Sequence, residues 1–242
     1  MSASIRIGCS GWQYRDWRGR FYQRDLPANR WLEFYAERFD TVELNASFYR
    51  LQPAATYRAW KRRLPPKFVM AVKASRYLTH TQRLRDPSEP LARLWRRVDE
   101  LGPHLGPVLY QLPPRWSFNA ERLATFLDAV PAGRSQAIEF RDRSWDQAEA
   151  RVLLARAGVA LCLHDMPGSN PEPTPAGPFV YVRFHGAGQR YGGRYRLDTL
   201  RAWAERLETW AQQGLPSWVY FNNDIDGQAP RDAMRLRELV TR

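Results

Sequence analysis

The sequence alternates between short runs with a period of two residues and longer runs with a helical period, about eight times in 242 residues. A period of two is typical of strands, and apolar residues at helical spacing are typical of amphipathic helices. Strand–helix units repeated this often predict one α/β domain, a (β/α)8 TIM barrel that occupies residues 1–242. An open, doubly wound sheet is the alternative, but no GxGxxG turn follows the first strand.

The alternation lapses at one place. We expect strands at residues 5–10, 41–48, 68–74, 108–112, 136–141, 160–165, 179–185 and 218–223, with helices in most of the intervals between them. Residues 166–178, MPGSNPEPTPAGP, are too rich in proline and glycine for a regular helix. A domain linker is one interpretation. We favour an irregular surface loop that replaces the helix between strands six and seven, since the remaining tail could scarcely bury a core of its own.

The chain is strongly basic, with 37 lysines and arginines, 25 acidic residues and a net charge of +12. Such a charge favours acidic partners, either a small phosphate-bearing substrate or nucleic acid. Only Lys61, Lys67 and Lys73 are lysines, so the arginine excess could instead reflect codon bias. No apolar run approaches the ~20 residues of a membrane helix, and no signal-peptide segment opens the sequence. We therefore expect a cytoplasmic protein without a membrane partner, in which Cys9 and Cys162 are buried free thiols.

On each expected strand the polar residues occupy alternate positions, so their side chains should share one face and point into the barrel. Many of them lie near the C-terminal ends of the strands, where barrel active sites are built. The inward candidates are Ser10, Glu43, Asn45, Ser47, Lys73, Gln111, Glu139, Arg141, Arg183, His185, Asn222 and Asp224, with Asp165 at the end of strand six. Burying so many charges costs several kcal/mol each unless they pair. They therefore indicate an active site, with a structural ion-pair network of Glu43, Glu139, Lys73, Arg141 and Arg183 as the alternative.

A glycine-rich loop follows strand seven, within Phe179–Tyr195, FVYVRFHGAGQRYGGRY. Arginine, histidine and flexible backbone at one strand end favour an anionic ligand. Further rim candidates for substrate binding are His80, Asn223 and the aromatic residues Trp12, Tyr14, Tyr49, Trp145 and Tyr191. The aromatic residues could pack the top of the barrel or stack on a base or sugar ring.

The leading hypothesis is an enzyme, hydrolase-type by preference, that acts on an anionic substrate and needs no cofactor. Glu43 or Glu139 would be the general base and His185 the acid or charge stabiliser, with Lys73 as a further catalytic candidate. A divalent metal held by Glu43, Glu139, Asp165 and His185 is a less favoured variant. The positive charges of Lys73, Arg141 and Arg183 in the same pocket count against it.

Two other functions stay open. Glu43 and Glu139 at an aromatic-rich mouth would suit a two-carboxylate carbohydrate hydrolase, if their carboxyl groups lie ~5–9 Å apart. A non-catalytic nucleic-acid-binding module would use the arginines and exposed aromatic side chains, and its binding would depend steeply on salt.

The sequence as a whole resembles the YecE-like proteins. The matching motifs are GWxYxxWxGxFY at 11–22, ELNASFYR at 43–50, Lys73 with Thr79-His80, QLPP at 111–114, EFRxxSW at 139–145, Asp165, YVRFHG at 181–186 and FNND at 221–224. The resemblance implies a TIM-barrel fold and no established reaction. Its motifs coincide with the inward residues, and Cys9 departs from the threonine expected beside Ser10.

Overall fold

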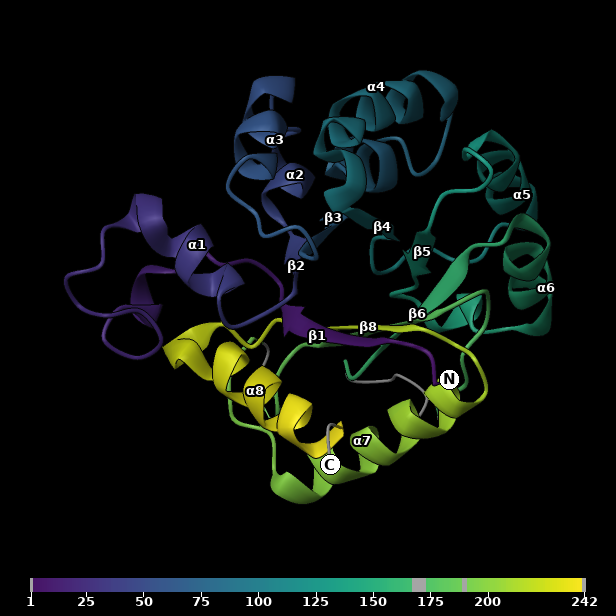
Figure 1. The fold of residues 1–242 in the computed structure, drawn as a ribbon. Helices are drawn as coiled ribbons and strands as arrows, with labels where there is room; N and C mark the ends of the chain where they lie inside the picture. Colours follow the sequence, from purple (N-terminus) through teal and green to yellow (C-terminus); the bar gives the residue numbers. More distant parts are fainter. Residues whose placement is uncertain (1, 167–172, 189–190, 241–242) are drawn as a thin grey trace.

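The computed structural model describes residues 2–166, 173–188 and 191–240. Its strands form a closed parallel barrel in chain order, each paired with the next and the last with the first (Figure 1). The strands are β1 (Ile5–Cys9), β2 (Thr41–Leu44), β3 (Val69–Lys73), β4 (Leu105–Gln111), β5 (Gln136–Glu139), β6 (Ala160–His164), β7 (Val180–Phe184) and β8 (Ser217–Phe221). The predicted (β/α)8 barrel is confirmed.

The helices lie outside the barrel (Figure 1). They are α1 (Trp31–Ala36), α2 (Ala46–Tyr49), α3 (Ala54–Lys61), α4 (Ser88–Val98), α5 (Ala120–Ala129), α6 (Ala148–Ala157), α7 (Leu197–Gln212) and α8 (Gln228–Val240). None of the described helices is long and apolar enough to cross a membrane. Between β6 and β7 the described residues form no helix, as expected, whereas 167–172 of that connection and 189–190 of the glycine-rich loop lie outside the described residues.

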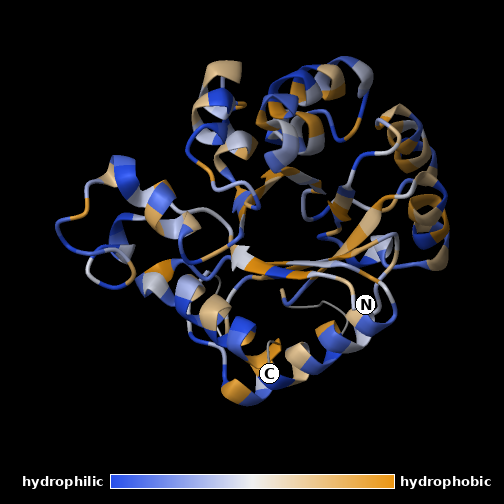
Figure 2. Ribbon diagram, in the orientation of Figure 1, coloured by the Kyte–Doolittle hydropathy of each residue, from blue (hydrophilic) through white to orange (hydrophobic). Residues whose placement is uncertain are grey.

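On each strand, every second side chain packs under the helices, and the side chains between them fill the barrel. Figure 2 shows largely apolar strands inside a ring of helices that alternate between hydrophilic and hydrophobic residues. A layer of buried, mostly apolar side chains packs together inside the barrel: Ala71, Leu109, Ala137, Ala160, Cys162, Phe179, Tyr181 and Tyr220. Because this layer is packed, the polar side chains farther along the strands face the C-terminal end of the barrel.

The predicted second strand is too long. β2 ends at Leu44, and α2 begins at Ala46, so Asn45 and Ser47 do not point inward from a strand. The alternation continues through ELNASF, but the hydroxyl of Ser47 donates to the carbonyl oxygens of Leu44 (3.1 Å) and Lys73 (2.6 Å). Those bonds hold the chain in a turn. Local periodicity carries no information about them, because one partner lies on another strand.

The Asn119 side chain caps α5, as its position in the sequence suggests. Its Oδ1 accepts a hydrogen bond from the backbone N–H of Arg122 at 2.7 Å. We expect Asn119→Ala to lower the free energy of unfolding by ~1 kcal/mol, since a helix N–H loses its acceptor. Urea denaturation would measure this as a lower midpoint with an unchanged slope. Asn119→Asp, which keeps an acceptor, should stay near wild type; an equal loss in both variants would contradict the capping role.

Candidate functional site

A single guanidinium group joins two carboxylates across the barrel interior. Arg183 donates to Glu43 from Nη2 (2.8 Å) and Nε (3.1 Å), and from Nη1 to Glu139 at 2.7 Å. The three side chains come from β7, β2 and β5, and each is at most 1% exposed. We call this group the Glu–Arg–Glu network. Charges that are this deeply buried persist only when they pair.

Further donors complete the network. The hydroxyl groups of Ser10 and Tyr181 each donate to Glu43 at 2.7 Å. Arg141 Nε donates to Glu139. Burial alone would raise the pKa of Glu139, but the charges of Arg141 and Arg183 outweigh it and hold that pKa well below its usual value. The sequence left a structural ion-pair network open as the alternative to catalysis. The geometry favours the network for both glutamates.

His185 supports the network from the end of β7. Its Nε2 lies 3.0 Å from Arg141 Nη2, and its Nδ1 lies 3.1 Å from the side-chain amide of Asn222. Burial lowers the pKa of His185 to about 3, so the ring is neutral at physiological pH. A guanidinium group can only donate, so Nε2 of His185 accepts from Arg141. In this arrangement His185 orients Arg141 and holds no proton that a substrate could take from Nε2.

A cavity of about 680 Å³ lies at the C-terminal ends of the strands, next to the network. Positive charges dominate its polar lining: Lys73 and Arg141 lie at the barrel mouth, Arg143 lies in the turn after β5, and Arg151 lies on α6. Two aspartates, Asp142 and Asp146, also line it, and Asp146 pairs with Arg151 at 3.0 Å. An excess of cations in a concave site favours an anionic ligand.

Lys73 is the most unusual group in this cavity. It ends β3 and is 8% exposed, and its Nζ lies 4.0 Å from the ring centroid of Phe48. Among the described residues, no hydrogen bond or ion pair of Nζ is found. Burial, reinforced by the positive charge of Arg183, lowers the pKa of Lys73 to about 7. The unprotonated amine, which is both a base and a nucleophile, is therefore accessible near neutral pH.

His80 lies beside this lysine on the cavity wall. It comes from a π-helical turn, η3 (Tyr77–Thr81), and its Nδ1 lies 2.9 Å from the hydroxyl of Thr79. Burial and then the charge of Lys73 lower the pKa of His80 to about 4. The ring is therefore neutral and can exchange hydrogen bonds with a ligand without adding charge. π-Helical turns frequently mark functional sites.

Six of the residues predicted from the sequence line the cavity: Tyr49, Lys73, His80, Gln111, Arg141 and Tyr191. Tyr49 is 78% exposed at the rim, where it is available for stacking. Gln111, at the end of β4, donates to the carbonyl oxygen of Leu112 at 2.9 Å. Strand parity and rim position therefore located about half of the polar lining.

Other predicted substrate contacts do not line the cavity. Trp12 packs edge-on against Trp60, and Trp145 Nε1 donates to the carbonyl oxygen of Trp116 at 2.5 Å. Tyr14 and Asn45 both donate to the carbonyl oxygen of Ser10, at 2.6 Å and 3.4 Å. These four side chains hold the loops after β1, β2 and β5. Trp12, Tyr14 and Trp145 therefore pack the top of the barrel, which was the alternative interpretation of their role.

The remaining candidates stabilise the ends of β6 and β8. Asp165 accepts from the backbone N–H of His185 at 2.7 Å and from the hydroxyl of Tyr195. Asn223 donates to the carbonyl oxygen of Gly193 and to buried Asp232, both at 2.9 Å. The hydrogen bonds of Asp165 and those of Asn223 fix the glycine-rich loop after β7. Asp165 and Asn223 position that loop and do not line the cavity themselves.

Several lining residues were missed by the sequence reasoning. His164 lines the cavity and makes a 2.8 Å hydrogen bond from Nε2 to the carbonyl oxygen of Phe140. Cys162, a free buried thiol as expected, also borders it. The inward parity of β6 contains both residues, so the alternation in ALCLH could have identified them. Arg143 and Arg151 lie beyond the strand, where alternation gives no signal.

The four candidate metal ligands are occupied by other contacts. Glu43 and Glu139 bind Arg183, Asp165 accepts from Tyr195, and Nε2 of His185 faces Arg141. Within residues 2–166, 173–188 and 191–240, no three histidine, cysteine or acidic side chains lie together as a possible metal site.

Fold and site together define a (β/α)8-barrel protein with a buried Glu–Arg–Glu network beside a cation-lined cavity. The chain belongs to the DUF72 family, whose model, described as "Protein of unknown function DUF72", matches residues 6–242. This membership confirms the resemblance to the YecE-like proteins.

Relatives match along nearly their whole length. The UPF0759 protein YunF of Bacillus subtilis is 28% identical, covering 98% of this chain and 94% of YunF. The UPF0759 protein YecE of Escherichia coli is 24% identical, covering 93% of this chain and 89% of YecE. The crystal structure of a DUF72 family protein from Thermotoga maritima superposes with a TM-score of 0.90 at 27% identity, covering 99% of this chain and all of that one (100%). The barrel is therefore shared with a solved member of the family.

Proposed function

We propose that this protein is an enzyme that binds a small anionic carbonyl compound in the cavity and reacts with it through the amine of Lys73. The observation that carries the proposal is the state of this amine. Lys73 faces a cavity of about 680 Å³, makes no hydrogen bond to a described residue and has a pKa of about 7. Lysines buried near other cations are the ones that form imines with carbonyl substrates.

The arginines of the cavity supply recognition of the anion. Arg143 forms no ion pair with a described residue. Arg141 lies at the mouth of the barrel beside Lys73; its Nε and Nη2 donate to Glu139 and His185, which leaves Nη1 for a ligand. Guanidinium groups bind carboxylate and phosphate oxygens in a bidentate way. A ligand whose anionic group binds these arginines would bring its carbonyl carbon toward Lys73. The substrate class is therefore an oxo acid or a phosphorylated aldehyde or ketone.

The chemical step follows from the neutral amine. The nitrogen lone pair of Lys73 attacks the carbonyl carbon, and the C=O π electrons move to oxygen. A proton then passes from this nitrogen to the oxygen, which gives a neutral carbinolamine. Loss of one water molecule, carrying the carbonyl oxygen, leaves the C=N bond of an imine. The protonated imine draws electrons from the adjacent bond and so permits proton removal or carbon–carbon cleavage there. Lys73, a further catalytic candidate in the sequence, is thus the nucleophile of this proposal, whereas the sequence favoured acid–base chemistry with Glu43 or Glu139 as the general base.

The carbohydrate alternative fits this geometry less well. Glu43 and Glu139 are fully buried and bound by one guanidinium, so a glycosidic bond cannot lie between them. An acid that protonates a leaving group needs a raised pKa, whereas the arginines hold the pKa of Glu139 low.

Reductive trapping tests the proposal. Incubation with cyanoborohydride and pyruvate, glyoxylate or glyceraldehyde 3-phosphate should reduce the imine to a stable secondary amine on Lys73, located by peptide mass spectrometry. The trapping rate should rise with pH around an apparent pKa of about 7, because only the unprotonated amine attacks. Lys61 and Lys67, the other lysines, are exposed and provide an internal control. Equal labelling of all three lysines, or none at Lys73, would overturn the proposal.

A further inference from the structure

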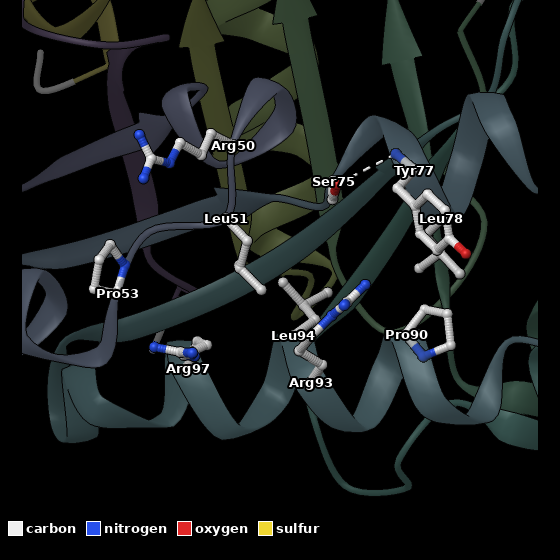
Figure 3. Close-up of a pocket in the computed structure, with 10 residues that line it drawn as sticks. All are labelled: Arg50, Leu51, Pro53, Ser75, Tyr77, Leu78, Pro90, Arg93, Leu94 and Arg97. Atoms are coloured by element: carbon white, nitrogen blue, oxygen red, sulfur yellow. Dashed lines mark hydrogen bonds between the residues drawn. The ribbon is translucent and has the colours of Figure 1, made fainter.

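A second, smaller cavity lies on the outer side of η3. It measures about 340 Å³ and is formed by the connection between α2 and α3, by η3 and by α4 (Figure 3). Leu51, Leu78 and Leu94 supply its apolar side chains, and Arg50, Arg93 and Arg97 supply its charges (Figure 3). We call it the arginine groove. None of its lining residues lines the cavity at the barrel mouth.

Within the part of the chain that the structure describes, the three arginines of the groove have no carboxylate partner. No aspartate or glutamate lines the groove, and none of the three forms an ion pair with a described residue. Arginines nearby behave differently: Arg58 binds Glu100 at 2.6 Å, and Arg134 binds Asp99 at 2.9 Å. Carboxylates are therefore present in this part of the molecule, but they neutralise other arginines.

The positions of two of these arginines add an unfavourable interaction. Arg93 and Arg97 lie four residues apart on α4, where like charges repel. Arg93 is held over the ring of Tyr77, its Cζ 5.7 Å from the centroid, and Tyr77 is 41% exposed. An anion between the guanidinium groups would relieve the repulsion. The helix therefore presents two adjacent, uncompensated guanidinium groups toward one concave, partly apolar site.

We propose that the arginine groove is a second ligand site, which binds the phosphate group of an organic phosphate ester. Phosphate offers three acceptor oxygens and up to two negative charges, which suit several guanidinium groups at once. The leucines and Tyr77 provide the apolar surface for the organic part of the ligand. Such an ester comes either from a free nucleotide or from a nucleic-acid strand, and this chain's net charge of +12 is compatible with both.

The test compares variants of α4. Isothermal calorimetry with AMP and with inorganic phosphate probes the free ester. Anisotropy of a labelled single-stranded DNA of about ten nucleotides probes the strand. We expect Arg93→Gln/Arg97→Gln to lower the affinity for whichever probe binds by at least about tenfold, since two charge-assisted contacts are lost. Arg96→Gln removes the same charge from the same helix at a residue that does not line the groove, and it should change affinity less than about twofold.

The outcomes separate the sources and the alternatives. Binding of AMP identifies a nucleotide site, and binding of the DNA alone identifies a strand. If Arg96→Gln weakens binding as much as the double variant, the attraction is general surface charge and the proposal is wrong. It is also wrong if no probe binds wild type. Lys73→Met should leave binding to the arginine groove unchanged, so a failure of this inference can be distinguished from a failure of the proposed lysine chemistry.

Discussion

Replacing Arg183 by methionine is expected to lower the free energy of unfolding by about 3–5 kcal/mol, the largest effect of any single substitution considered for this barrel. The change leaves Glu43 and Glu139 fully buried without the guanidinium group that joins them. Methionine fills much of the arginine volume, so the loss comes chiefly from the uncompensated carboxylates. Among the described residues, Ser10, Tyr181, Arg141 and the thiol of Cys162 would still donate to them.

Chemical denaturation monitored by tryptophan fluorescence would measure this loss. The matched control removes all three charges in Glu43→Gln/Glu139→Gln/Arg183→Met. The triple variant leaves Arg141 without its partner Glu139, but it removes both fully buried carboxylates together with Arg183, so it should be more stable than Arg183→Met alone. The single variant should also lose less stability in acid than at neutral pH, since without Arg183 the pKa of Glu139 rises and its charge disappears. A cost below about 1 kcal/mol for Arg183→Met, typical of an exposed ion pair, would contradict a structural network.

Replacing Lys73 by methionine is expected to abolish reductive trapping and to stabilise the protein at the same time. The amine is the nucleophile, so no imine forms without it. The folded protein instead loses a buried cation whose pKa is lowered from 10.5 to about 7. Each pKa unit corresponds to about 1.4 kcal/mol, so the gain should reach a few kcal/mol where both folded and unfolded lysine would be protonated.

The pH dependence has a definite sign. Between pH 7 and 10.5 the unfolded chain binds a proton at Lys73 that the folded chain does not, so wild-type stability rises with pH in this window. Below pH 7 the free-energy cost of burying the charged Lys73 amine is constant and fully present. The stability of Lys73→Met should therefore exceed that of wild type most at about pH 6, and this difference in stability should shrink as the pH rises toward 10. Thermal denaturation across this range measures it. A variant less stable than wild type at pH 6 would show that Lys73 is a structural cation.

Lys73→Arg separates the two roles of this residue. Arginine keeps the positive charge and cannot act as an amine nucleophile, because its pKa exceeds ~12. We expect trapping to vanish in this variant too, without the gain in stability. Persistent trapping at the mutated cavity would place the reactive group elsewhere.

Sequence periodicity was sufficient to predict the barrel fold and to identify those residues of the site that lie on strands. Parity alone assigned Glu43, Lys73, Glu139, Arg183 and His185 to the barrel interior, and the structure places all five there or at its mouth. Parity works because side chains alternate strictly along a strand, so the local pattern reports which face a residue occupies. It fails at Asn45, where contacts from β3 end the strand early.

Only the tertiary structure decided which inward residues are partners and which face open space. Arg183 meets Glu43 and Glu139 across 140 and 44 residues of sequence, and no local pattern encodes that a closed barrel brings β2, β5 and β7 together. The arginine groove likewise depends on the packing of η3 against α4. Residue types and their parity were therefore determined by the sequence itself. The division into a buried ion-pair network, a reactive lysine and an uncompensated arginine groove was decided by the fold, because pairing and burial depend on contacts distant along the chain.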